Sequence, residues 1–352
     1  MKITLKVPIF VLSIIFLLSF FLTPTYPATV QEVITLYNQK DYLQSIEAAK
    51  SVINDPKSTT EQKAQAQLFL AQSVEGLKGK KEALPEYLKV IENYPTSKTQ
   101  CPYAMYSIFS YYWNSHEYDQ AIMILTKAIE QYPDSPLTPG MIWYIPLCYA
   151  EKKQYAKALE YALNNDSIHL REPSAAGPVA QAQNGPLQKI IAQWSILAES
   201  PDVLLQAKLY YDTTDLNNIQ DPIDMICTLL KAEDLNLVRV NKFIQYQKEG
   251  KGEDILKDIK VPQARKKYLT GLVERCGNTY REQKIATYLL LMAGDPKQAL
   301  QKAKKAYSLC PMNQLNQAIM DIAICLKAID GNIIRANQFI QAQTKGESFP
   351  LE

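Results

Sequence analysis

Few residues of this sequence have the types and spacing that catalysis or metal binding requires. The two histidines, His116 and His169, fall in predicted loops, and neither has a second His or a Cys at metal-ligand spacing. Four aspartates between residues 212 and 224 lack the Gly and closing Glu of a calcium loop, so we interpret them as a helix-capping turn. Nucleophile elbows, Gly-rich phosphate loops and HExxH patterns are absent. The sequence therefore predicts no catalytic residue, cofactor or metal, and an enzyme with an unrecognised site is only a remote alternative.

Six cysteines, at positions 101, 148, 227, 276, 310 and 325, are the remaining reactive side chains. An even number would suit disulfides in an oxidising compartment, yet the spacings match no framework. Cys148, Cys227 and Cys325 lie inside apolar helical runs, where a buried thiol is the ordinary role. We therefore favour free buried thiols, and the alternative is a disulfide within the C-terminal block.

The composition is that of a folded chain without charge bias. With 352 residues, 47% hydrophobic content and only 12 glycines, the chain can bury a large core. Lys2 and Lys6 are the only charged residues among the first 28, so the remainder carries 36 basic and 36 acidic side chains. A nucleic-acid-binding protein would show a basic excess or a basic stripe, and the sequence therefore predicts no nucleic-acid partner.

Residues 1–28 have the layout of a secretory signal peptide. An uncharged apolar run over residues 7–22 follows the two lysines, and the helix breakers Pro24 and Pro27 come next. As a helix this run rises about 24 Å, less than the roughly 30 Å of a bilayer core. We therefore predict a cleaved signal and a periplasmic or other extracytoplasmic location. An uncleaved N-terminal membrane anchor is the alternative, because Tyr26 stands where a small residue usually precedes the cleavage site.

The first half of the chain repeats a helix with a fixed end. In YDQAIMILTKAIEQYP (residues 118–133), small and apolar residues stand three or four apart on one helical face, and Pro133 ends the helix. Related stretches begin near Tyr42, Lys81 and Tyr155, at spacings of 39, 37 and 37 residues. Each follows another helix with apolar periodicity, so the repeated unit is a pair of helices.

These units resemble tetratricopeptide repeats, in which two small residues flank a bulky one on the second helix and a Pro closes the unit. The residues that carry the pattern are Ala71, Ala83, Tyr87 and Pro95 in unit two, and Ile108, Tyr112, Ala121, Leu125, Ala128 and Pro133 in unit three. The phrase YPDSP and the 37-residue spacing are similar to repeats of the periplasmic TolA-binding and outer-membrane-assembly families. Phe109 and Pro146 replace the usual small residue of the first helix in units three and four, so altered crossing angles are expected there.

The second half repeats with a longer period. Residues 231–250 match residues 327–346 at an offset of 96, with identical residues at eleven matched positions. We infer two helix pairs in each block, separated by a helical spacer at about 253–280. Residues 164–186 have little periodicity and contain four helix breakers, which predicts a linker.

No strand-like alternation occurs, so we predict an all-α protein. The resemblance implies a right-handed superhelical solenoid of antiparallel helix pairs in two segments. The predicted domains are a signal peptide at 1–28, an N-terminal array of about four helix pairs at 29–165, a linker at 166–186, and a C-terminal repeat-like array at 187–352 with the 96-residue duplication.

The resemblance also implies a binding surface, because such arrays bind peptides on a concave face lined by the first helix of each pair. The lining positions carried onto this sequence are Tyr37, Leu68, Gln72, Tyr103, Tyr106, Trp113 and Trp143. They predict a largely aromatic groove, and packing between repeats is the alternative role for these aromatic residues.

Two functions follow from this interpretation. The first is an exported adaptor or scaffold that binds a peptide or protein partner in the cell envelope. The alternative is a structural subunit of an envelope or outer-membrane assembly complex, which would bring association with a membrane complex. No small-molecule substrate is inferred.

Overall fold

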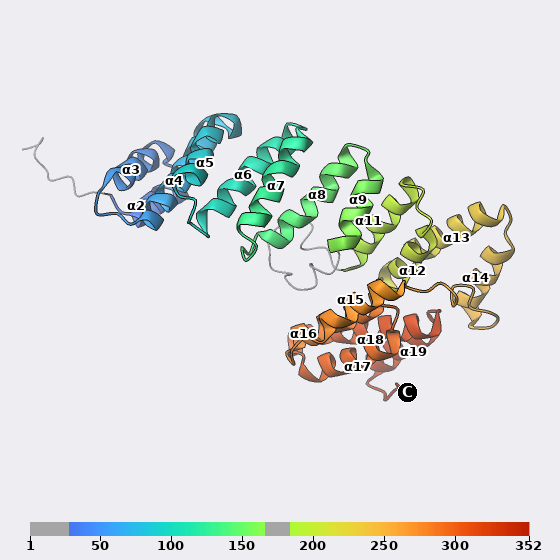
Figure 1. Cartoon of the computed structure of the whole chain (residues 1–352). Coiled ribbons are helices and arrows are strands. Elements are labelled where there is room, and N and C mark those ends of the chain that lie inside the picture. The colour runs from blue at the N-terminus through green and yellow to red at the C-terminus, as the bar shows by residue number, and fades with distance from the viewer. Residues whose placement is uncertain (1–27, 166–183, 352) are drawn as a thin grey trace, which may run out of the picture. The chain divides into compact units, whose positions relative to one another are not determined.

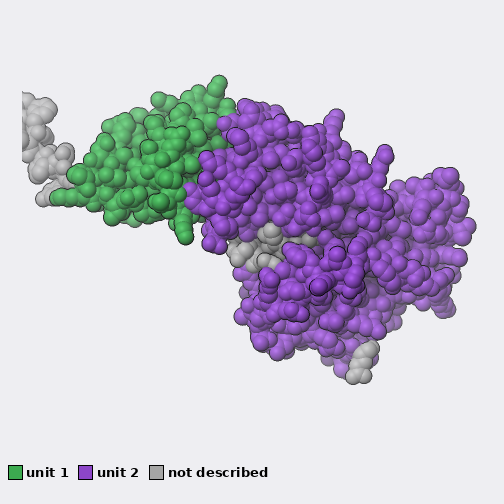
Figure 2. Space-filling model, viewed as in Figure 1, with its two compact units in different colours: residues 1–111 green, residues 112–352 purple. Residues whose placement is uncertain are grey.

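The computed structural model describes residues 28–165 and 184–351, and the regular structure in these ranges is entirely helical (Figure 1). The prediction of an all-α protein is therefore confirmed. The predicted signal peptide and most of the predicted linker lie outside the described residues. The chain divides into two compact units, which are residues 1–111 (unit 1) and residues 112–352 (unit 2) (Figure 2).

The described part of unit 1, residues 28–111, contains four complete helices and most of a fifth. They are α2 (Val30–Asn38), α3 (Tyr42–Asn54), α4 (Thr60–Lys78), α5 (Lys80–Asn93) and α6 (Gln100–Asn114), whose last residues belong to unit 2. Polar residues cap the starts of α3 and α4: Asp41 accepts from the backbone N–H of Gln44, and Thr59 forms a capping box with Gln62. Consecutive helices pack against each other from α2 to α5, as helix pairs of a repeat should.

Small residues allow α2, α3 and α4 to approach closely. Val33, Ala49 and Ala66 are fully buried between these helices. Two buried serines satisfy their hydroxyls internally, since Ser73 donates to Ser45 Oγ (2.9 Å) and Ser45 donates to the carbonyl of Val33 (3.2 Å). Each buried polar atom thus has a partner, and the contact between α3 and α4 costs little desolvation.

Unit 2 contains the remaining helices. They are α7 (Tyr118–Gln131), α8 (Thr138–Glu151), α9 (Tyr155–Asn165), α11 (Asn184–Leu197), α12 (Val203–Thr213), α13 (Gln220–Asp234), α14 (Val238–Glu249), α15 (Gln263–Val273), α16 (Tyr280–Met292), α17 (Pro296–Leu309), α18 (Leu315–Asp330) and α19 (Ile334–Lys345), with short 3₁₀ helices η1 (Leu216–Asn218) and η2 (Met312–Gln314). Although the predicted linker separates α9 from α11 in sequence, these two helices pack directly together. The compact units consequently divide inside α6 and not at residues 166–186.

The 96-residue duplication extends over a whole five-element block. The first block, α11 to α14, and the second block, α16 to α19, have the same order of helices, each with a 3₁₀ turn in the middle. The matched starts are 184 and 280, 216 and 312, and 238 and 334, each pair 96 residues apart. The helical spacer between the blocks is α15.

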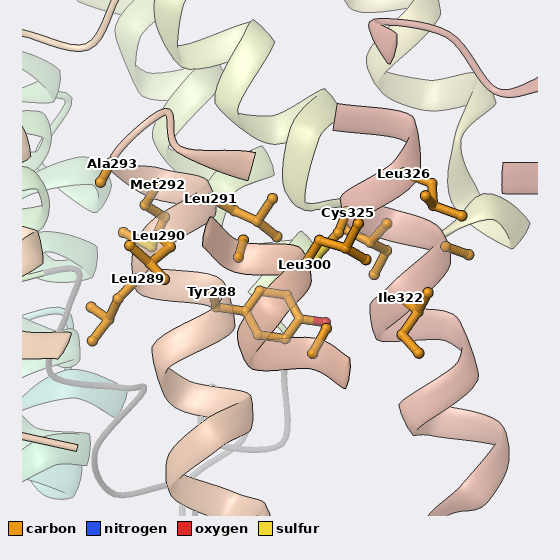
Figure 3. Close-up of a cluster of buried hydrophobic side chains, with 14 of the residues drawn as sticks. Tyr288, Leu289, Leu290, Leu291, Met292, Ala293, Leu300, Ile322, Cys325 and Leu326 are labelled. Carbon is orange, nitrogen blue, oxygen red and sulfur yellow. The ribbon is translucent and has the colours of Figure 1, made fainter. Parts of the chain in front are cut away.

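The two blocks also pack against each other, which distinguishes this region from an array with contacts between sequence neighbours only. Helix α12 of the first block contacts α16 and α18 of the second, and α14 contacts α19. One hydrophobic cluster joins the helices from α15 to α19, and Figure 3 shows side chains of this cluster, including Leu291, Leu300 and Cys325. Helix α16 is surrounded by other helices in this cluster, and residues 286–293 are all buried.

Candidate partner-binding surface

The seven predicted lining residues divide between the units. Tyr37, Leu68, Gln72, Tyr103 and Tyr106 belong to unit 1, whereas Trp113 and Trp143 belong to unit 2. In unit 1, Tyr103 is exposed, and Tyr37, Gln72 and Tyr106 are half-buried. Leu68 is buried.

Packing within α2, α3 and α4 holds the ring of Tyr37. Its centroid lies 5.3 Å from that of Phe69, edge to face, and 5.9 Å from that of Tyr42. Such pairs fix the ring while leaving part of it open to solvent. Burial raises the pKa of Tyr37, with smaller contributions from Tyr42 and Glu75, so the hydroxyl stays protonated and can donate.

Glu75 brings a carboxylate to the same face. The hydroxyl of the buried Tyr87 donates to Glu75 Oε2 at 2.6 Å. Burial, and then this hydrogen bond, raise the pKa of Tyr87 far above its usual value. Sequence reasoning missed Glu75, although it occupies the twelfth position of unit two, the register position that nominated Tyr37 and Trp113.

Helix α6 carries the other two predicted lining tyrosines of unit 1. Tyr103 and Tyr106 lie one helical turn apart, and the Tyr106 ring packs 5.6 Å from that of the buried Phe109. On the next turn, Ser110 accepts a hydrogen bond from Lys80 Nζ at 2.7 Å, which connects α5 to α6. The surface formed by Tyr37, Gln72, Glu75, Tyr103 and Tyr106 is called here the tyrosine face of unit 1.

The expectation that Trp143 lines an open groove is corrected by its burial. Only 1% of this residue is exposed, and it packs with Ala158, Leu159 and Ile191 from α9 and α11. Leu68, at the same fifth position of its unit, is buried as well. A bulky apolar side chain at this position is therefore covered by neighbouring helices, and both residues contribute to packing in this structure.

Trp113 is intermediate between the exposed tyrosines of unit 1 and the buried Trp143. The side chain is half-buried, and its ring contacts Tyr118 (5.6 Å) and Tyr144 (6.0 Å) edge to face. His116 follows in the adjoining turn with φ of 60°, and its Nδ1 lies 2.8 Å from the Tyr118 hydroxyl. This aromatic cluster holds the corner between α6 and α7 and leaves Trp113 partly exposed.

A cavity of about 410 Å³ in unit 2 is lined partly by charged side chains. The charged residues that line it are Lys208, Lys257, Lys260, Lys266, Asp212 and Asp254. Ion pairs already engage several of them, such as Lys208 with Asp212 (2.5 Å) and Lys257 with Glu253 (2.6 Å). Since opposite charges compensate one another here, the lining selects no particular ligand.

The reactive residues of the sequence take structural roles where they are described. Of the four aspartates in the predicted capping turn, Asp215 accepts from the backbone N–H groups of Asn217 and Asn218, whereas Asp212 and Asp221 form ion pairs with Lys208 and Lys189. Cys148 and Cys325 are buried, and burial raises the pKa of Cys148 to about 12, which suppresses thiolate chemistry.

Within residues 28–165 and 184–351, no group of three or more His, Cys, Asp or Glu side chains could hold a metal ion. The helices in the same ranges are too short or too polar to cross a membrane.

Comparison with protein-family models and a search of curated proteins both returned no match to this chain. The geometry of the tyrosine face and the helical-repeat architecture therefore stand as the basis for a functional proposal.

Proposed function

We propose that this protein is a tetratricopeptide-like adaptor of the cell envelope that binds a peptide or protein partner on the tyrosine face of unit 1. The observation that carries this proposal is that Tyr37, Tyr103 and Tyr106, on the first helices of their pairs, are all at least partly exposed, and ring contacts hold Tyr37 and Tyr106 in place. A helical-repeat scaffold commonly presents its ligand-binding residues on these helices.

The chemistry of this face suits an extended peptide. Tyrosine rings supply rigid apolar area at little entropic cost, and their hydroxyls can donate or accept hydrogen bonds. Gln72 adds an amide, and Glu75 adds an acceptor for backbone N–H groups or a basic side chain. Because the sequence after residue 28 carries equal numbers of basic and acidic side chains, shape and hydrogen bonding are expected to contribute more affinity than long-range charge.

Substitution of Tyr106 separates binding from stability. Tyr106→Ala should weaken partner binding by about 2 kcal/mol, roughly thirtyfold, because anchoring aromatic residues dominate such interfaces. Leu88→Ala is a matched control, since Leu88 is an exposed apolar residue on α5 of the same unit. Equal binding by both variants in titrations with the captured partner would remove the tyrosine face from the proposal.

A structural subunit of an envelope assembly is the second candidate. Affinity capture from the native envelope distinguishes the two: one soluble partner supports the adaptor, and a set of membrane proteins supports the subunit. The proposed export is checked separately by N-terminal sequencing of the protein from its host. A chain that begins at Met1 and fractionates with the cytoplasm would contradict the extracytoplasmic location.

A further inference from the structure

The contact between the two blocks of unit 2 uses a specific docking turn. At residues 330–334 of the second block, the carbonyls of Asp330 and Gly331 accept hydrogen bonds from α14 of the first block. Tyr246 donates its hydroxyl to Asp330 O (2.7 Å), and Gln247 donates Nε2 to Gly331 O (2.6 Å). The second block thus carries a turn, and the first block carries its receptor.

The first block carries the same turn at residues 234–238. The matched contacts are the ion pairs Asp234–Arg239 (2.9 Å) and Asp330–Arg335 (2.7 Å), and the hydrogen bonds from Val238 N to Asn236 Oδ1 (2.8 Å) and from Ile334 N to Asn332 Oδ1 (3.0 Å). Leu235 and Gly331 share a left-handed backbone, with φ of 55° and 66°. The duplication has therefore preserved the conformation of the docking turn.

The two turns differ in exposure. In the first block, Leu235 is 89% exposed, and Leu237 and Val238 are exposed beside it. In the second block, the counterparts Gly331, Ile333 and Ile334 are partly buried. Three adjacent large apolar side chains on a preformed turn make a surface that gains free energy when covered.

The receptor surfaces show the complementary difference. Tyr211 of the first block is 1% exposed, and Leu216 packs against the core of the second block. Their counterparts 96 residues later are Tyr307 and Met312, which are 37% and 84% exposed. The second block therefore presents at its end the side chains that the first block buries against its neighbour.

Gly250 and Gly346, which end the last helices of the two blocks, show the same difference in how closely their surroundings are packed. A Cβ atom on Gly250 would lie 2.9 Å from Ile334 Cδ1 of the docked turn. A Cβ atom on Gly346, its counterpart, would meet nothing within 4 Å. The receptor of the first block is therefore occupied by Ile334 at this position, and the position of Gly346 in the second block is open.

A buried lysine adds a polar element to the pattern. Lys327 Nζ donates to the carbonyls of Tyr211 and Thr214 at the C-terminal end of α12. Its counterpart Lys231 is exposed. The counterpart of Thr214 is Cys310, and the two residues end their helices, α12 and α17, with similar ψ angles of 138° and 140°. The end of α17 thus offers carbonyls in the same backbone geometry to Lys231 of another copy.

We propose that the chain self-associates head to tail through these surfaces. The exposed turn of the first block in one copy docks on the end of the second block in another copy, in the place that corresponds to the contact between the blocks within one chain. Gln343 stands there in the place of Gln247, and Ala342 replaces Tyr246, so this contact has one hydrogen-bond donor fewer. A Cβ on Gly331 would clash with the Asp254 carboxylate at 2.5 Å, but at the open receptor the counterpart of Asp254 is Pro350. Leu235, the counterpart of Gly331, thus meets an apolar residue. The contact is heterologous and leads to a ring or an open chain of copies.

Cysteine cross-linking of the full-length protein tests this arrangement. We would prepare Leu235→Cys and Pro350→Cys separately, since both positions are exposed and tolerate the change. The proposal predicts a covalent dimer when the two variants are mixed and oxidised, and none above the wild-type background from either variant alone. The double variant should give a ladder of oligomers. Dimers from Leu235→Cys alone, or no dimer in the mixture up to the solubility limit, would overturn it.

Sedimentation velocity supplies a second measurement that requires no cross-link. Leu235→Asp places an unpaired charge in the proposed contact and should weaken self-association by about tenfold or more. Leu43→Asp, at an exposed leucine of unit 1, should leave association at the wild-type level. A monomeric wild-type protein, or equal effects of the two substitutions, would contradict the head-to-tail contact.

Discussion

Replacing Lys327 with Met should remove a pH dependence of stability that the wild-type protein shows between about pH 7 and 10.5. Lys327 is fully buried between the blocks, where Nζ donates to Thr214 O (2.6 Å) and lies 4.6 Å from the centre of the Tyr211 ring. Burial lowers the pKa of this lysine from 10.5 to about 7. The groups whose charges also act on Nζ are Asp212, Asp215, Lys208 and Cys325.

The sign and size of the pH dependence of stability follow from the different pKa values of Lys327 in the folded and unfolded states. Between pH 7 and 10.5 the unfolded chain binds a proton at this lysine that the folded protein has released, so stability rises with pH. Below about pH 7 both states bind the proton, and the dependence ends. One pKa unit corresponds to about 1.36 kcal/mol, which gives a gain of roughly 2 to 3 kcal/mol between about pH 7.5 and 9.5.

Urea unfolding at a series of pH values measures this gain. The informative quantity is the free energy of unfolding of the wild type minus that of Lys327→Met, because other titrating groups cancel in the difference. Lys231→Met is the matched control, since this lysine occupies the same place in the first block but is exposed. A difference that stays constant from about pH 7.5 to 9.5 would show that Lys327 keeps its proton in the fold and would refute the reasoning.

Two further pairs of substitutions test the packing. Gly76→Ala should lower the thermal midpoint, by the equivalent of about 1 kcal/mol, because the added Cβ would lie 2.5 Å from Cζ of Tyr42. At Gly271, an added Cβ meets nothing within 4 Å. Gly271→Ala should therefore raise the thermal midpoint, by the equivalent of up to about 1 kcal/mol, through the higher helix propensity of Ala. Trp143→Ala should cost about 3 to 5 kcal/mol of stability in chemical denaturation, as core aromatics do, and Trp113→Ala should cost clearly less. Equal midpoints for the two glycine variants, or equal costs for the two tryptophan variants, would contradict these assignments.

Helix positions could be predicted from the sequence because local signals fix them. The periodic stretches after Tyr42 and Tyr118 are α3 and α7, and Pro95 and Pro133 each follow a helix end by two residues. These signals act over one helical turn, through side-chain spacing and the loss of a backbone donor at Pro. They require no knowledge of the neighbours.

Exposure could not be predicted in the same way, because it depends on which helix covers a given face. The repeat register placed Tyr106 and Trp143 at equivalent positions, yet only Trp143 is buried, since α9 and α11 pack over it. The contact of α12 with α16 and α18 was likewise missed, because the path of the spacer that contains α15 brings the blocks together. The identity over residues 231–250 did indicate the duplication, but it did not show that one copy of the turn is docked and the other exposed.

The most direct test of the proposed function is photo-cross-linking in the native host. A photoreactive phenylalanine analogue would replace Tyr103 on the tyrosine face or, as the control, the exposed Leu88 on α5. Our account predicts a discrete covalent adduct from position 103 and none from position 88 after irradiation of intact cells. Adducts of the same protein from both positions, or an adduct from position 88 alone, would show that the partner does not bind on the tyrosine face.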